Sequence, residues 1–255
     1  MHQRRFSNTK GHAKGRIWAL ADDHPAIVEA RPLFPKTVAA SVSPRLFVSG
    51  ENSRKLGKQV MKGEWVGLPI YQLTLPERTT CPAHCHAWNS CYGNAMPFAR
   101  RHQPGKELEE YIPREILDLV RRHPAGFVVR LHVLGDFYSA DYVSMWFNLM
   151  REHKGLHLFG YTARDEEHDR NIFSRIMVMN SVWPKRCSIR YSRKEPGYMH
   201  AIIVKPEQEV TQDVILCPAQ TEKSQCCATC ALCWSPAAFE KTIAFIEHGP
   251  TRSRT

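Results

Sequence analysis

One short stretch holds an unusual density of soft metal ligands, CPAHCHAWNSCYGN at residues 81–94. Its three cysteines follow a C-x3-C-x5-C spacing: Cys81, Cys85 and Cys91. Three thiolates can hold an iron–sulfur cubane and leave one iron free for an outside ligand. A zinc site needs four protein ligands, so His84 or His86 would have to join the thiolates. The spacing therefore predicts a cluster with one open position, and the two imidazoles are the rival fourth ligands.

A second group of cysteines lies near the C-terminus and holds five of the nine in the chain. Three of them follow a C-x2-C-x2-C spacing, and the end of an expected strand can supply a fourth thiolate, which gives the set Cys217, Cys227, Cys230 and Cys233. Tetrahedral sulfur ligation suits zinc as well as a cubane, although consecutive C-x2-C pairs are more familiar from ferredoxin-type loops. We expect a closed four-thiolate site here, with Cys226 as the spare, while Cys187 stands alone.

Polar residues at the ends of expected strands are the candidates for binding a cofactor. A glycine at a strand end lets a ligand approach the backbone, and a carboxylate there can accept from an amine or a ribose. The alternative is that Asp136 only caps its turn. Arginines and hydroxyls follow the next two strands and are expected at the same rim. The candidate cofactor-binding residues are Gly135, Asp136, Tyr161, Arg164, Arg190 and Ser192.

Helix and strand patterns alternate along the middle of the chain. Strands are expected at 68–76, 127–135, 156–164 and 186–193, and helices at 113–123, after Ser139, and at 169–180. Pro113 suits the first position of its helix. Two more strands are expected at 200–207 and 210–218, and residues 242–248 fit a strand or a short helix. This alternation is typical of parallel βα units, so the fold class is α/β, as a partial barrel or an open sheet with cysteine-rich metal-binding loops.

The polar and proline-punctuated start of the chain shows no sustained period. We expect a basic, poorly packed arm at 1–45, a single α/β domain at 46–248 that includes the cysteine-rich segment 214–235, and a basic tail at 249–255.

Composition narrows the class of protein. Hydrophobic residues at 43% and charged residues at 24% are those of a globular chain. No apolar run reaches about 18 residues and no apolar signal core starts the chain, so we expect a cytoplasmic protein without a membrane partner. Reduced cytosolic thiols favour metal ligation over disulfides.

The net charge of +10 would suit a polyanion such as nucleic acid or a nucleotide. No motif of a hydrolase or a nucleotide kinase stands out. The oligomeric state is not predicted.

A set of motifs in a fixed order resembles the phage and bacterial gene product 88 family over roughly residues 45–248. The motifs are NSRKLGK, LTLPERTTCPAHC, the CY at 91–92, RLHVLGDFYSADY, FGYTARD and the late C-x2-C-x2-CW. This resemblance implies a family but no particular activity.

More distantly, the chain is similar to radical S-adenosylmethionine enzymes, which carry a cysteine triad after a first strand and a Gly-acid pair after a second. The similarity implies a partial βα barrel, a 4Fe-4S cluster on the triad, and S-adenosylmethionine on the fourth iron with its amino group near Gly135 and Asp136. The last cysteine gap here is five residues, Tyr92 follows Cys91, and Leu-Gly-Asp stands where that family has Gly-Gly-Glu.

Two functional hypotheses follow. The first is an iron–sulfur protein with a redox or radical activity on a nucleic acid, a nucleotide or a protein. The second is a non-catalytic zinc-binding module that binds nucleic acid or a host protein, with zinc at the C-terminal site.

Overall fold

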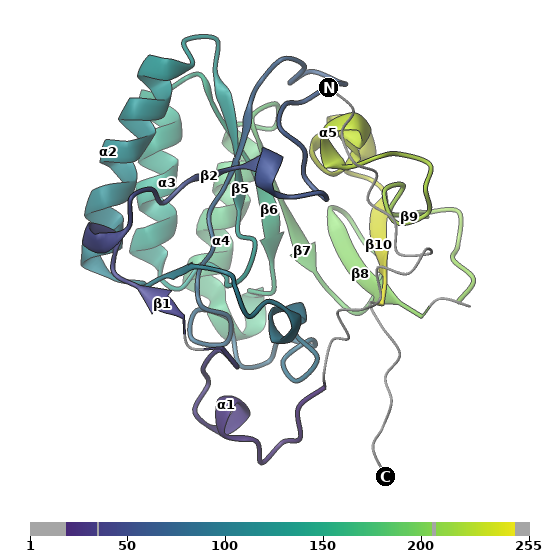
Figure 1. Cartoon of the computed structure of the whole chain (residues 1–255). Coiled ribbons are helices and arrows are strands. Elements are labelled where there is room, and N and C mark those ends of the chain that lie inside the picture. Colours follow the sequence, from purple (N-terminus) through teal and green to yellow (C-terminus); the bar gives the residue numbers. More distant parts are fainter. Residues whose placement is uncertain (1–18, 35, 206–207, 248–255) are drawn as a thin grey trace.

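A computed structural model describes residues 19–34, 36–205 and 208–247 of the chain (Figure 1). The basic segment at 1–18 and the basic tail at 249–255 lie outside these residues. No helix among the described residues is both long enough and apolar enough to cross a membrane.

The molecule is built on an eight-stranded sheet with the order β2-β3-β5-β6-β7-β8-β10-β9. The strands are β2 Val48–Ser49, β3 Ile70–Gln72, β5 Phe127–Leu131, β6 Leu156–Thr162, β7 Cys187–Ser192, β8 His200–Val204, β9 Val214–Leu216 and β10 Thr242–Ile246. Every neighbouring pair is parallel except β2 and β3. The two outer strands, β2 and β9, lie at opposite ends of the order, so the predicted parallel βα units form an open sheet.

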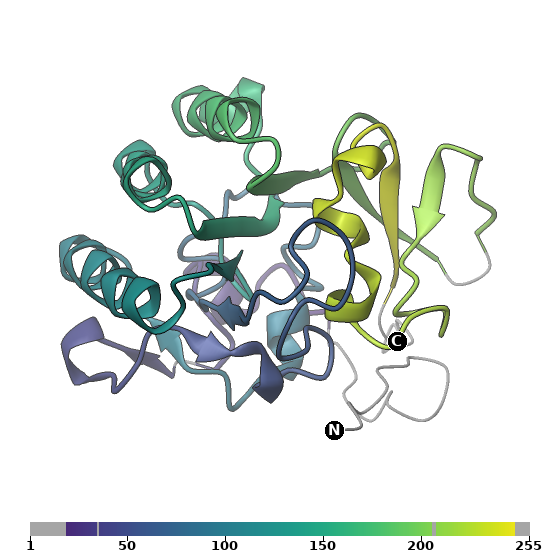
Figure 2. The ribbon, with the colours of Figure 1, turned by 90° about the horizontal axis from the view of Figure 1, so that it is seen from above.

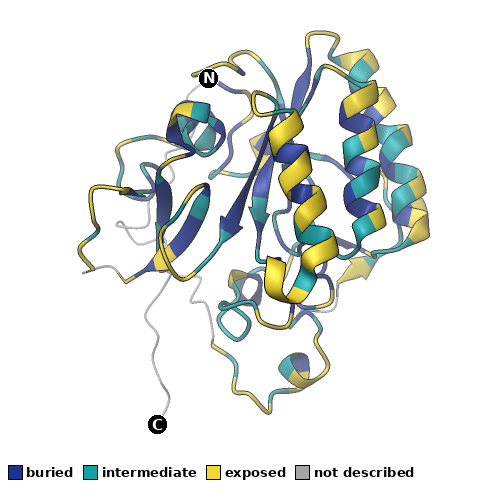
Figure 3. Cartoon of the chain, turned by 180° about the vertical axis from the view of Figure 1, so that it is seen from behind, coloured by how far each residue is buried: buried dark blue, intermediate teal, exposed yellow. Residues whose placement is uncertain are grey.

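Three long helices cover one face of this sheet (Figures 1 and 2). They are α2 Lys106–Arg122, α3 Ala140–Glu152 and α4 Glu166–Val182. Ser139 caps α3 as predicted, because its hydroxyl accepts from the backbone N–H of Tyr142 at 3.0 Å. Many residues of α4 are exposed, and Figure 3 shows them in yellow along this helix, with the sheet behind it.

Two helix starts differ from the prediction. The helix expected at 113–123 begins seven residues earlier, at Lys106, so Pro113 lies inside it. The apolar face continues backwards through buried Leu108 and Ile112, and this burial outweighs the hydrogen bond that the proline cannot donate. The helix expected at 169–180 begins at Glu166, because Asp165 caps it through the N–H of His168 at 2.8 Å.

The opposite face of the sheet is covered by irregular segments. Within β5, Phe127, Val129 and Leu131 pack in the core under the helices, whereas Val128 belongs to a second apolar cluster. That cluster also contains Trp65 and Trp234, whose rings stack with centroids 5.3 Å apart. The short helix α5, Cys227–Cys230, lies on this side, across the sheet from the three long helices (Figure 2). Cys226, Cys227 and Cys233 are therefore part of a second core.

Smaller elements complete the described chain. Residues Thr242–Ile246, which fitted a strand or a helix, form strand β10 between β8 and β9. Before Leu46, α1 Pro25–Val28 and β1 Thr37–Val38 are formed, and β1 pairs in parallel with β4 Arg101–His102. Short 3-10 helices lie at Ala40–Val42, Gly50–Asn52, Tyr92–Ala95, Leu232–Trp234 and Pro236–Ala238.

Candidate metal centres

The four C-terminal cysteines predicted from spacing line one cavity. Cys227 and Cys230 are the first and last residues of α5, one helical turn apart. Ala231 then takes a left-handed conformation, with φ 59°, and turns the chain so that Cys233 faces the same space. Cys217 follows β9, and its N–H donates to the carbonyl of Ala244 at 2.8 Å. The cavity lining consists of these four cysteines with Tyr161, Pro218, Ala219, Leu232, Trp234 and Phe245.

Strands β6 and β7 fix the last of these cysteines in place. The carbonyl of Cys233 accepts from Ser188 Oγ at 2.7 Å and from Arg190 Nε at 3.0 Å. The hydroxyl of Tyr161 donates to Cys233 Sγ at 3.0 Å. Arg190 is completely buried, and its remaining donors go to the carbonyls of His200, Ala238 and Lys241. Arg190 therefore anchors the C-terminal segment to the sheet.

Two cations stand beside this cavity. Arg130 of β5 is buried, and its charge acts on Cys227 and Cys233. Within the described part of the chain, its Nε has no hydrogen-bond partner. Lys55 is partly buried, and its ammonium lies 4.9 Å from the ring centroid of Phe245. Burial, with a contribution from Arg130, lowers the pKa of Lys55. The sequence patterns predicted a role for neither residue, although an arginine in the apolar strand FVVRL was a signal for Arg130.

Burial also acts on the thiols of this site. It raises the pKa of Cys217 and Cys227, and it raises the pKa of Cys230 to about 11. Without a metal these groups are neutral thiols at pH 7, and a metal that binds them displaces their protons.

The first triad lies on a loop, with all three cysteines half-buried. Cys91 and Cys85 contribute, after burial and Asp136, to the raised pKa of Cys81, so the three thiols lie in one region of the loop. Burial raises the pKa of Cys91 to about 12. Burial and then the carboxylate of Asp136 raise the pKa of Cys81. The charge of Arg78 acts in the opposite sense on the pKa of Cys85 and Cys91, so charges of both signs surround the triad.

Buried arginines hold this loop. Arg101 forms a bidentate pair with Glu77, at 2.6 and 2.8 Å, and both side chains are at most 1% exposed. The same guanidinium donates to the carbonyls of Gly93, Met96 and Ala99. A side chain on Gly93 would lie 2.6 Å from the carboxylate of Glu77, so the loop needs glycine there. The sequence patterns did not predict this ion pair.

A second arginine crosses the same loop. Arg78 donates to the carbonyls of Trp88 and Arg31, at 3.0 and 3.3 Å, and to Asn94 Oδ1 at 2.7 Å. Trp88 and Asn94 lie on either side of Cys91, so Arg78 fixes the path of the chain around that thiol.

The two rival histidines lie in different surroundings. His84 Nε2 lies 3.0 Å from Asp165 Oδ2 and 3.2 Å from the carbonyl of Ala163, at the start of α4. Burial, followed by the charges of Lys194 and Arg193, lowers the pKa of His86.

Protein donors occupy most of the acceptor sites of Asp136. Its carboxylate accepts from the N–H of Phe137, the hydroxyl of Thr162 and the N–H of Ala163, each at 2.7 Å. A carboxylate offers about four acceptor sites, so one remains. Burial raises the pKa of Asp136 to about 6. Gly135 has φ +81°, and a Cβ there would lie 2.6 Å from Leu75 Cβ. Packing of the protein on itself therefore accounts for the Gly-Asp pair.

The other predicted rim residues divide between the two regions. Arg164 donates to the carbonyls of Phe137 and Thr80 and to Asp169 Oδ1, and so lies beside the first triad. Tyr161 and Arg190 belong to the C-terminal site. Ser192 is the last residue of β7, on the same face of that strand as Arg190.

The spacing of ligand atoms distinguishes these cysteines from a compact single-ion site. Among the described residues, the one group of three or more His, Cys, Asp or Glu ligand atoms that all lie within 4.8 Å of one another is His84, Asp165 and His168. Zinc–sulfur bonds of about 2.3 Å would put neighbouring sulfurs about 3.8 Å apart in a tetrahedron. Among the described residues, neither cysteine set contains three sulfurs that all lie within 4.8 Å of one another.

Comparisons with known proteins address the family. No curated protein and no solved structure matches this chain. These comparisons give no match to radical S-adenosylmethionine enzymes, so that similarity stays a hypothesis. The family model for gene product 88 matches residues 46–236, which is 191 of the 255 residues and includes both cysteine sets. The chain therefore belongs to the gene product 88 family.

Proposed function

We propose that this protein binds two iron–sulfur clusters. Cys217, Cys227, Cys230 and Cys233 hold a closed cluster, and Cys81, Cys85 and Cys91 hold a second one with an open position. The observation that carries the proposal is the single cavity lined by all four C-terminal cysteines.

The spacing of the C-terminal cysteines favours a cluster over zinc, because consecutive C-x2-C-x2-C is more familiar from ferredoxin-type loops. A site with four thiolates is anionic with either metal, and Arg130 and Lys55 stand beside these cysteines as compensating charges.

The triad is the better candidate for chemistry. An iron with an open position supplies one-electron transfer and a binding site for an outside ligand. The residues of the chain hold that position in place: Arg78 and Arg101 fix the loop, and Arg164 ties Thr80 to α4. We propose a redox or radical reaction, with S-adenosylmethionine as the outside ligand and a nucleic acid, nucleotide or protein as substrate. The net charge of +10 favours a polyanionic substrate.

The test is anaerobic purification followed by iron, sulfide and zinc analysis. We expect a brown protein with iron and sulfide in equal amounts, about four of each per loaded site. S-adenosylmethionine added to the reduced protein should then change its electron paramagnetic resonance spectrum. A colourless protein with stoichiometric zinc would overturn the proposal in favour of a zinc module. If the protein contains iron but its spectrum does not change with S-adenosylmethionine, the clusters stand and only the proposal of this ligand is wrong.

A further inference from the structure

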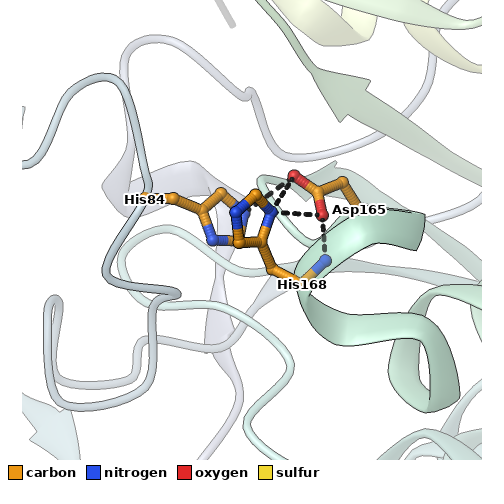
Figure 4. Close-up of side chains that lie close together, drawn as sticks. All are labelled: His84, Asp165 and His168. Atoms are coloured by element: carbon orange, nitrogen blue, oxygen red, sulfur yellow. Dashed lines mark hydrogen bonds and ion pairs between the residues drawn. The ribbon is translucent and has the colours of Figure 1, made fainter.

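We infer that His84, Asp165 and His168 form a separate binding site for one divalent transition-metal ion, at the start of α4. None of the three belongs to a cysteine set, so the inference does not rest on the proposed clusters. Figure 4 shows the two imidazole rings on one side of the carboxylate of Asp165, with His84 on the cysteine loop and the other two residues at the start of the helix.

The distances between ligand atoms fit one ion. His84 Nε2 lies 3.0 Å from Asp165 Oδ2, and His168 Nδ1 lies 3.0 Å from Asp165 Oδ1. The ligand atoms of the three residues all lie within 4.8 Å of one another. Metal–nitrogen and metal–oxygen bonds of about 2.0–2.2 Å put neighbouring ligands about 2.8–3.1 Å apart in octahedral sites and about 3.3–3.6 Å apart in tetrahedral sites. The rings of His84 and His168 stack with centroids 4.2 Å apart and 26° between their planes, so one imidazole must rotate before both nitrogens face the same ion.

A second carboxylate is aimed at the same place. Among the described residues no group donates a hydrogen bond to Asp169 Oδ2, a buried atom of a side chain that is 15% exposed, and this oxygen lies 3.9 Å from His84 Nε2. The other oxygen, Oδ1, accepts from Arg164 Nη1 at 2.6 Å, which fixes the carboxylate. A buried carboxylate oxygen without a donor is costly unless a cation or water meets it. An ion between the histidines would supply that partner.

The donor set indicates the class of metal. Two imidazoles and one carboxylate suit Zn²⁺, Co²⁺, Ni²⁺ or Fe²⁺, whereas Mg²⁺ and Ca²⁺ prefer oxygen ligands alone. The side chain of His168 is 49% exposed, so solvent reaches the site and water can complete the coordination sphere. His84 lies between Cys81 and Cys85, so the ion ties the cysteine loop to α4.

The test is a Co²⁺ and Zn²⁺ titration of the full chain, purified anaerobically with its clusters in place. Equilibrium dialysis with metal analysis should find one added ion per chain, and bound Co²⁺ should lack sulfur charge-transfer bands. His168→Ala should weaken this binding at least about tenfold, since even outer-shell changes cost that much. Asp165→Asn should weaken it as well, and asparagine still caps the helix, so folding is kept.

His153→Ala is the matched control, because His153 lies at the C-terminal end of α3 and outside this group. It should bind the ion like the unmodified chain, and all variants should keep the same iron content. The inference is overturned if the unmodified chain takes up no added ion. It is equally overturned if His168→Ala and Asp165→Asn bind the ion as tightly as the control.

Discussion

The C-terminal cysteines lie on secondary structure that packs into a core, whereas the first triad lies on a loop that buried charges hold. Three of the four C-terminal ligands are on or directly after α5, and the fourth follows β9. The first loop depends on Arg78 and on the pair of Arg101 with Glu77. The C-terminal cysteines are thus held by packed secondary structure, whereas the triad is held by side-chain hydrogen bonds to its loop.

The charges around the two sites also differ. Arg130 and Lys55 act on the C-terminal thiols, while Asp136, Glu77 and Arg78 act on the triad, so charges of both signs surround the triad. Cations stabilise an anionic site with four thiolates. The comparison favours a structural role for the C-terminal site.

The largest expected effect comes from Cys230→Ser. Metal-binding free energy in a structural site is also folding free energy, on the order of 10 kcal/mol, so soluble yield, metal content and melting temperature should fall together. Cys226→Ser is the matched control, because Cys226 is buried in the second apolar cluster and does not line the cavity. Equal damage in both variants would mean that the ligand set is wrongly assigned.

Arg101→Met should break the support of the loop. It leaves the buried carboxylate of Glu77 without its ion-pair partner, which lowers the free energy of unfolding by about 3–5 kcal/mol. Metal at the triad should fall more than metal at the C-terminal site. Arg121→Met removes an exposed pair with Asp118, whose two side chains are 69% and 62% exposed, and should cost less than about 1 kcal/mol. A similar small cost for both variants, measured by urea unfolding, would contradict the anchoring role.

Acid should lower the free energy of unfolding through His102, which lies in β4 beside Arg101. Burial, followed by the charge of Arg100, lowers the pKa of His102 to about 4. The unfolded state binds a proton below about pH 6.5, so this stability is present above that pH and is lost as the pH falls towards 4, with roughly 2 kcal/mol gone by pH 5. His102→Gln should flatten the pH dependence of unfolding between 6.5 and 4. An unchanged slope would show that another group carries it.

The smallest effect tests the charges at the C-terminal site. Lys55→Met removes a cation beside the thiols and should make the reduction potential of that cluster more negative, by roughly 1 kcal/mol or about 40 mV for one electron. Lys58→Met is the control in the same segment, since Lys58 is exposed and pairs with Glu51 at 3.2 Å. The same shift in both variants would indicate only a general charge effect.

Spacing and periodicity predicted the parts of the fold that depend on local sequence. The C-x2-C-x2-C run, the cap at Ser139 and the apolar strands are short-range features, and the structure has the last two as expected. The predicted start of α2 was wrong. Pro113 was assigned to the first turn, but burial of Leu108 and Ile112 extends the helix back to Lys106.

Spacing and periodicity could not predict the charged residues that lie beside the two cysteine sets. Arg130 and Lys55 meet the C-terminal cysteines only after the sheet and the segment at 53–61 have packed together. Asp165 and His168 are 80 or more residues from His84 in sequence, and only the fold brings them together. Pairs of this kind depend on tertiary contacts, which no local pattern encodes.

The most direct test of two independent clusters is the iron content of two single variants, measured beside the unmodified chain under anaerobic conditions. Cys85→Ser and Cys230→Ser share no site, so each should lose about half of the iron and sulfide, and Cys226→Ser should lose none. The account predicts that iron remains at the C-terminal site in Cys85→Ser. Loss of all iron in Cys85→Ser, or zinc in place of iron in the unmodified chain, would contradict it.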